Sequence, residues 1–107
     1  MKLGYSPFTN RLTPLDEAYR LAMELKLDFI ELAWDVQELD PRTQPAGAVR
    51  ELARATGVGC TLHLPFVDVN LASLMPGVAA NSVARVQRAL DYAGEVNAIV
   101  GVLHTGF

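Results

Sequence analysis

Two short segments, Thr61-Leu62-His63-Leu64-Pro65-Phe66 and Val102-Leu103-His104-Thr105-Gly106-Phe107, decide how the chain is interpreted. Each is an apolar run that leads into a histidine, and together they hold the only two histidines of the 107 residues. In a parallel α/β sheet the chemistry lies where strands end, so both imidazoles are expected on one rim of the sheet.

The segments between and before these runs alternate between strand and helix patterns. Short, largely apolar runs predict strands near 3–6, 29–34, 58–63 and 98–104, and apolar residues at helical spacing predict helices near 14–26, 46–56 and 77–95. The polar stretch 35–44, which contains Pro41, is expected to be a loop. The order βαβαβαβ predicts an α/β fold with four parallel strands in a single domain, 1–107. Two architectures fit: the first half of a (β/α)8 barrel, or a small doubly wound sheet.

Composition and charge make several classes of protein less favoured, without excluding a nucleic-acid partner. The formal net charge is -3 with acids and bases interspersed, so no basic stripe is available to hold a phosphate backbone. The single cysteine, Cys60, cannot form an intrachain disulfide and suits a reducing compartment. No signal peptide and no membrane span is recognisable, so we expect a cytoplasmic protein without a membrane partner.

The two histidines are the leading candidates for a metal site. Neutral imidazole is a common ligand of zinc and similar metals, and His63 and His104 on neighbouring strands can converge on one ion. The alternative is a pair of structural histidines with satisfied hydrogen bonds. A catalytic metal also needs more than two ligands and an open position.

Four further residues are candidates for contacts with a substrate. Glu31 interrupts an apolar strand, so it is either a ligand, base or substrate contact at the mouth of the sheet, or one half of an ion pair with a helix arginine. Trp34 and Phe66 could wall a sugar or a base by stacking, although packing beneath loops is the commoner fate of such rings. Asn70 follows His63 on the same connection, where turn formation would also explain it.

The run His63-Leu64-Pro65-Phe66-Val67-Asp68-Val69-Asn70-Leu71-Ala72-Ser73, followed by His104-Thr105-Gly106, resembles the xylose-isomerase-like TIM barrels. That superfamily includes sugar phosphate isomerases and epimerases and nucleases of the endonuclease IV type. Its members show a similar His-x-Pro-aromatic with a downstream Asn after strand three, and a His-x-Gly after strand four. Leu3-Gly4-Tyr5-Ser6 and Phe29-Ile30-Glu31-Leu32 extend the resemblance over the whole chain.

The resemblance implies the N-terminal half of a metal-dependent sugar phosphate isomerase or epimerase. His63 and His104 would bind a divalent ion (Zn, Mn or Mg) or contact the substrate, and Glu31 matches a position that is often acidic in the isomerase branch. The later acidic ligands of the family are absent from these 107 residues, so activity is expected only from a complete barrel.

Two alternatives stay open beside the isomerase. The first is a nuclease for apurinic sites, which would bring nucleic acid in as a partner. The second is a non-catalytic half-barrel that self-assembles or serves as an interaction module. A four-stranded piece of a barrel exposes two strand edges and an apolar inner face, so either self-association or completion by a C-terminal half is expected.

Overall fold

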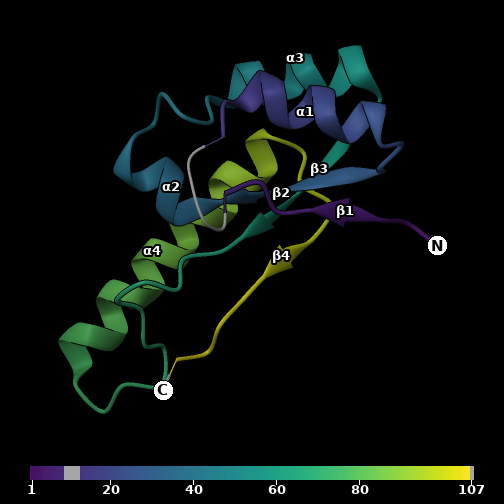
Figure 1. The fold of residues 1–107 in the computed structure, drawn as a ribbon. Helices are drawn as coiled ribbons and strands as arrows, with labels where there is room; N and C mark the ends of the chain where they lie inside the picture. The colour runs from purple at the N-terminus through teal and green to yellow at the C-terminus, as the bar shows by residue number, and fades with distance from the viewer. Residues whose placement is uncertain (9–12, 107) are drawn as a thin grey trace.

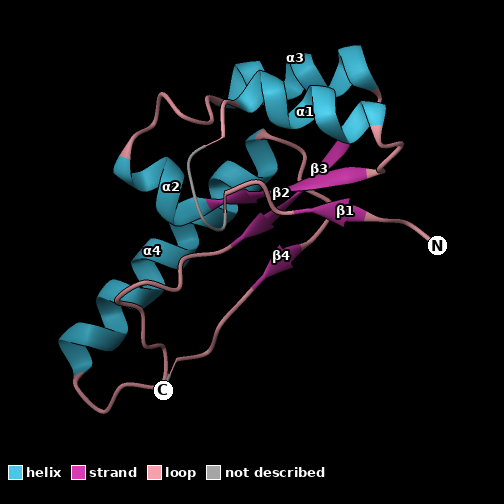
Figure 2. Cartoon of the chain, viewed as in Figure 1, coloured by secondary structure: helices cyan, strands magenta, loops and turns pink. Residues whose placement is uncertain are grey.

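The computed structural model describes residues 1–8 and 13–106. Within these ranges the strands are β1 (Gly4–Tyr5), β2 (Phe29–Ala33), β3 (Gly59–His63) and β4 (Gly101–Val102). The helices are α1 (Leu15–Glu24), α2 (Trp34–Leu39), α3 (Ala46–Thr56) and α4 (Pro76–Glu95). Figure 1 shows this course of the chain, and Figure 2 separates its helices from its strands. Among the described helices, none combines the length and the apolar character that crossing a membrane requires.

The strands form one parallel sheet in the order β1-β2-β3-β4. Strands that follow one another along the chain therefore also lie side by side in the sheet, and the first strand lies at an edge. A doubly wound sheet instead places its first strand inside, with helices on both faces. The prediction of four parallel strands is confirmed, and their order is that of a segment of a (β/α)8 barrel.

The core lies between the sheet and the helices α1, α3 and α4. Ile30 and Leu32 of β2, with Cys60 and Leu62 of β3, are almost completely buried on this side. Tyr5 belongs to the same side, since its hydroxyl donates to the Ala18 carbonyl in α1. Small helix residues allow close approach to the strands, and the buried ones are Ala18, Ala22, Val49 and Ala89.

The strand register places a second set of side chains on the opposite face. Phe29 pairs with Gly59, Glu31 with Thr61, and Ala33 with His63. Because side chains alternate along a strand, these residues point away from the helices, to the side that a closed barrel encloses. Gly4 also lies there, and a Cβ on it would fall 2.3 Å from the Phe29 ring.

The largest difference between the structure and the sequence-based expectation is an additional helix. The stretch 35–44 was expected to be a loop, but Trp34–Leu39 forms α2, so Trp34 begins a helix and does not end a strand. The run from Trp34 to Leu39 contains neither Gly nor Pro, and Pro41 comes only after its end. A helix of about one and a half turns is too short to show the apolar periodicity by which a helix is recognised in a sequence.

The two edge strands are shorter than expected, with β1 at Gly4–Tyr5 and β4 at Gly101–Val102. Each has a partner on one side only, which limits the ladder. Backbone bonds nevertheless continue beside β4, from Leu62 N–H to the Val100 carbonyl and from Leu64 N–H to the Val102 carbonyl. Helix α3 ends at Thr56, as the sequence predicts. Gly57 follows it directly and adopts the left-handed conformation, with φ 73°.

Candidate functional site

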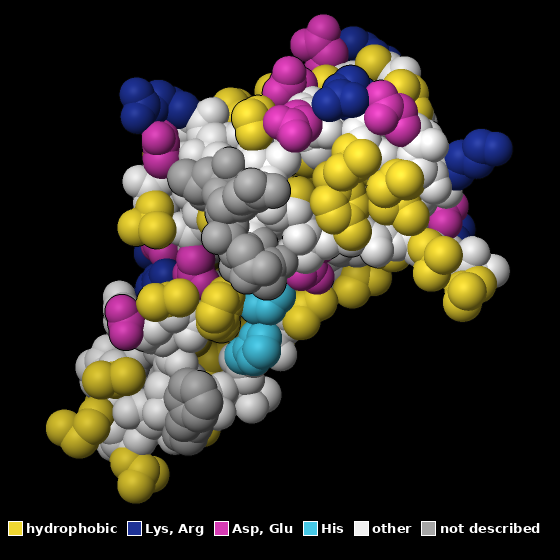
Figure 3. Space-filling model, in the orientation of Figure 1, with side chains coloured by type: hydrophobic (Ala, Val, Ile, Leu, Met, Phe, Trp, Pro, Cys, Tyr) yellow, Lys and Arg dark blue, Asp and Glu magenta, His cyan; other side chains and the backbone are white. Residues whose placement is uncertain are grey.

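The two histidines meet at the carboxyl ends of β3 and β4. His63 is the last residue of β3, and His104 follows β4 by two residues. Their Nε2 atoms lie 3.1 Å apart, and the ring centroids are separated by 4.9 Å. Figure 3 shows both imidazoles at the surface, side by side between apolar side chains. The expected convergence on one rim is therefore present.

The backbone orients the His63 ring. Its Nδ1 lies 3.0 Å from the Leu64 carbonyl oxygen, which can only accept a hydrogen bond. This contact assigns the proton of the neutral ring to Nδ1 and leaves the lone pair of Nε2 directed at His104. Such a carbonyl contact is the usual support of a metal-binding histidine.

The distance between the Nε2 atoms suits a shared ion. Zinc binds imidazole nitrogen at about 2.0–2.1 Å, so two nitrogens on one tetrahedral zinc lie roughly 3.3 Å apart. The observed 3.1 Å is close to that value, and it is also the distance of a direct hydrogen bond from the His104 Nε2–H to His63 Nε2. Within residues 1–8 and 13–106 no group of three or more His, Cys, Asp or Glu side chains could hold a metal. The described part of the chain can thus supply two ligands of such a site.

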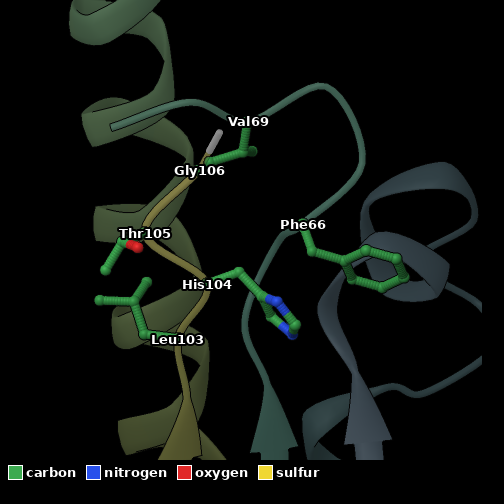
Figure 4. A pocket seen from close by; sticks show the side chains of 6 residues that line it. All are labelled: Phe66, Val69, Leu103, His104, Thr105 and Gly106. Carbon is green, nitrogen blue, oxygen red and sulfur yellow. The ribbon is translucent and has the colours of Figure 1, made fainter. Parts of the chain in front are cut away.

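Phe66 forms a wall beside the two imidazoles. Its ring centroid lies 4.8 Å from that of His63, in an edge-on arrangement, and 5.7 Å from that of His104. The ring is nevertheless 47% exposed. Figure 4 shows the His104 side chain projecting to the side of Phe66, whereas Leu103 and Thr105 project the other way. These residues line a hollow of about 280 Å³ together with Val69 and Gly106.

Asn70 joins the connection after β3 to the end of the chain. Its Oδ1 accepts from the Ala72 N–H at 3.1 Å, which is the turn contact expected of this residue type. A Cβ on Gly106, whose φ is 104°, would fall 2.4 Å from that same oxygen. Only a glycine allows this approach, so the two segments that follow β3 and β4 lie against each other behind the histidines.

Glu31 lies one layer below the rim. Its register partner is Thr61, two residues before His63, and both line a small hollow on the face away from the helices. An ion pair with a helix arginine would require the opposite face. The Trp34 side chain is directed into the packed interior. It is 8% exposed, and its ring centroid lies 5.7 Å from that of Tyr92 in α4. This is the packing alternative for that residue.

A group of charged residues beside the site was missed by the sequence analysis. Asp35 and Glu38 of α2 face Arg85 and Arg88 of α4, with ion-pair distances from 2.6 to 2.9 Å. Burial alone would raise the pKa of Glu38, but hydrogen bonds from both arginines outweigh burial and hold that pKa below its ordinary value. The sequence does hold one indication of this group. The two acids are three residues apart, as are the two arginines, so each pair lies on one face of its helix.

Comparison with solved structures gives several likenesses over most of the chain. A D-tagatose 3-epimerase-like protein is 27% identical, with a TM-score of 0.80 over 100% of this chain. A D-psicose 3-epimerase from Clostridium cellulolyticum H10 is 18% identical, with a TM-score of 0.78 over 94% of this chain. A protein from Thermus thermophilus, soaked with ZnCl2, is 27% identical, with a TM-score of 0.65 over 99% of this chain.

This chain spans only part of those proteins: 39% of the first, 37% of the second and 39% of the third. A search of curated proteins gives no match. The model of the family described as "Xylose isomerase-like TIM barrel" matches residues 19–107, which include both histidines. The chain belongs to this family of xylose isomerase-like TIM barrels.

Proposed function

We propose that the chain is the N-terminal half of a metal-dependent sugar isomerase or epimerase. The observation that carries the proposal is the 3.1 Å approach of the His63 and His104 Nε2 atoms at the carboxyl ends of neighbouring strands. Active sites of (β/α)8 enzymes are built at this end of the barrel. The chain spans about two fifths of its structural relatives, so further ligands and the proton-transferring carboxylates would come from strands beyond β4.

The candidate site residues other than Trp34 each have a role in this proposal. His63 and His104 bind a divalent ion or contact the substrate directly. Phe66 covers one side of the hollow with an apolar ring, as a sugar-binding wall requires, and Asn70 supports the backbone behind it. Glu31 contributes a polar contact from the inner face of β2. When bound, the metal would polarise a substrate carbonyl and stabilise the ene-diolate formed by proton loss from the adjacent carbon.

The proposed substrate is a ketose or its phosphate. Two of the structural relatives bear the names of ketose 3-epimerases, and one of these structures contains D-tagatose. The hollow beside His104 combines apolar walls with an imidazole and with backbone polar groups. Such a lining suits a small polyol, which offers both C–H faces and hydroxyl groups.

The experiment is a calorimetric titration of the metal-free protein with Zn2+, Mn2+ and Co2+. We expect one site, and His63→Ala or His104→Ala should weaken binding by more than about tenfold while helical circular dichroism is kept. Thr105→Ala is the matched control, because Thr105 adjoins His104 but projects to the other side. Unchanged metal affinity in both histidine variants would refute the metal-binding role of His63 and His104.

Activity should then be measured on the protein completed to a full barrel. Metal-dependent interconversion of ketose epimers is the expected result. Cleavage of DNA at apurinic sites, without any action on sugars, would instead support a nuclease of the endonuclease IV type.

A further inference from the structure

The backbone that carries Phe66 is held at several points. The side chains of Phe66 and Val67 are 47% and 49% exposed, so apolar packing fixes these two residues little, although Leu64, Pro65 and Val69 on either side are buried. Exposed loops without such packing are ordinarily mobile. The ring nevertheless stands beside both imidazoles, and polar contacts to the backbone of residues 66 and 67 add to the support that the buried neighbours give.

Asp35 supplies the first part of that interaction. Its Oδ2 accepts hydrogen bonds from two successive backbone N–H groups, from Phe66 at 3.1 Å and from Val67 at 3.3 Å. Its Oδ1 accepts from Arg85 Nη2 at 2.9 Å. The side chain is only 12% exposed. Charge-assisted hydrogen bonds at such partly buried positions are stronger than those between neutral groups.

Arg85 supplies the second part. Its Nη1 donates to the Val67 carbonyl, while Nε and Nη2 donate to Glu38 at 2.9 and 2.6 Å. Both backbone polar groups of Val67 are thus held by one ion pair, the N–H by Asp35 and the carbonyl by Arg85. Because Asp35 belongs to α2 and Arg85 to α4, the loop is tied to two helices at once.

We propose that Asp35 and Arg85 are positioning residues that hold the Phe66 ring against His63 and His104. Neither touches the imidazoles, and they act through the backbone of residues 66 and 67. The inference rests on the proposed function in treating the two histidines as groups that bind a metal ion or the substrate. It adds a device that presets one wall of the site before a ligand arrives, which reduces the ordering that binding requires.

The test is nuclear magnetic resonance of the metal-free protein, whose two histidines give two sets of imidazole C–H signals. An aromatic ring 4.8 Å from an imidazole displaces those signals, and Phe66→Leu defines the spectrum without the ring. We expect Asp35→Asn and Arg85→Gln to move the imidazole signals most of the way to the Phe66→Leu positions. Folded variants that keep the wild-type signals would overturn the inference.

The matched control is Asp40→Asn, which removes another acid–arginine pair. Asp40 binds Arg42 at 2.9 Å on the surface and does not touch residues 66 and 67. Its variant should keep the wild-type imidazole signals. If it shifts them as far as Asp35→Asn does, a general charge effect explains the result and the inference fails.

A second measurement needs no variant and decides the matter if the substitutions prevent folding. In the wild-type protein the amide hydrogens of Phe66 and Val67 should exchange slowly with solvent despite the exposure of these residues. Rapid exchange would overturn the inference. Both readouts use protein without metal, so absence of zinc binding would remove the proposed function and leave this inference standing.

Discussion

The two faces of the β2–β3 pair differ in what covers them. On the helix side, Ile30 and Leu62 are 0% exposed. On the other side, Phe29, Glu31 and His63 are only partly buried. The same strands supply both sets, because alternate residues point to opposite faces.

This difference separates stability from chemistry. The helix side is closed by α1, α3 and α4 and holds the apolar residues that support folding. The other side carries the polar groups, and within the described residues it is covered by no helix. Substitutions on the helix side should therefore change the free energy of unfolding, and those on the open side should chiefly change binding.

The largest effect is expected at Leu62. Leu62→Ala removes a fully buried side chain between sheet and helices, so it should lower the free energy of unfolding by roughly 2–5 kcal/mol. Val102→Ala truncates a residue on the open face, the register partner of His63, that is 38% exposed, and a loss below about 1 kcal/mol is expected. Urea unfolding followed by circular dichroism measures both. Equal losses would show that the two faces are closed to the same degree.

A smaller effect is expected where β2 ends. The Gln44 side chain is completely buried, and it exchanges two hydrogen bonds with the backbone of Ala33, at 3.1 and 2.9 Å. Gln44→Leu keeps the volume but leaves both backbone groups of Ala33 without these partners, which should cost roughly 1–3 kcal/mol.

Gln87→Leu on the exposed surface of α4 is the matched control for Gln44. Its unfolding free energy in urea should stay within about 0.5 kcal/mol of the wild type. If Gln44→Leu proves equally neutral, the end of β2 does not depend on this side chain.

Most of the fold could be predicted from the sequence, because apolar periodicity and chain order determine it. The runs at 29–33 and 59–63 are strands, and the histidine at the end of β3 and the one just after β4 fall on one rim as expected. Gly57 ends α3 by adopting a conformation that glycine favours. These features depend on local sequence and on the parallel order of the strands.

The support of the site could not be predicted in this way. Gln44 reaches back eleven residues to Ala33, and Arg85 reaches α2 across fifty residues. Polar contacts between residues so far apart produce no periodic pattern in the sequence. The helix that carries Asp35 and Glu38 was not predicted either, because a loop is expected at 35–44. Trp34 is a candidate because its ring could stack on a sugar or a base, and its contact with Tyr92 of α4 also joins residues far apart in the sequence.

The smallest effect on the free energy of unfolding is expected at Glu38, in the charged group at the rim. This contribution depends on pH, unlike that of the apolar residues on the helix side. Burial opposes the charge of Glu38, but hydrogen bonds from Arg85 and Arg88 keep its pKa in the folded protein below the ordinary 4.5. Its contribution to stability is therefore complete above pH 4.5 and is lost as the pH falls through the lower folded pKa. Glu38→Gln should cost about 1 kcal/mol or less at pH 7, and its stability should decline less than that of the wild type below pH 4.5.

Urea unfolding at a series of pH values tests this prediction, with Glu24→Gln as the control. Glu24 also pairs with an arginine, Arg20, at 2.9 Å, but both side chains are more than half exposed. Solvent weakens such a pair, so the control should follow the wild-type decline. Parallel curves for Glu38→Gln and the wild type would mean that the rim is not held by the charge of Glu38, and that Asp35 and Arg85 act without it.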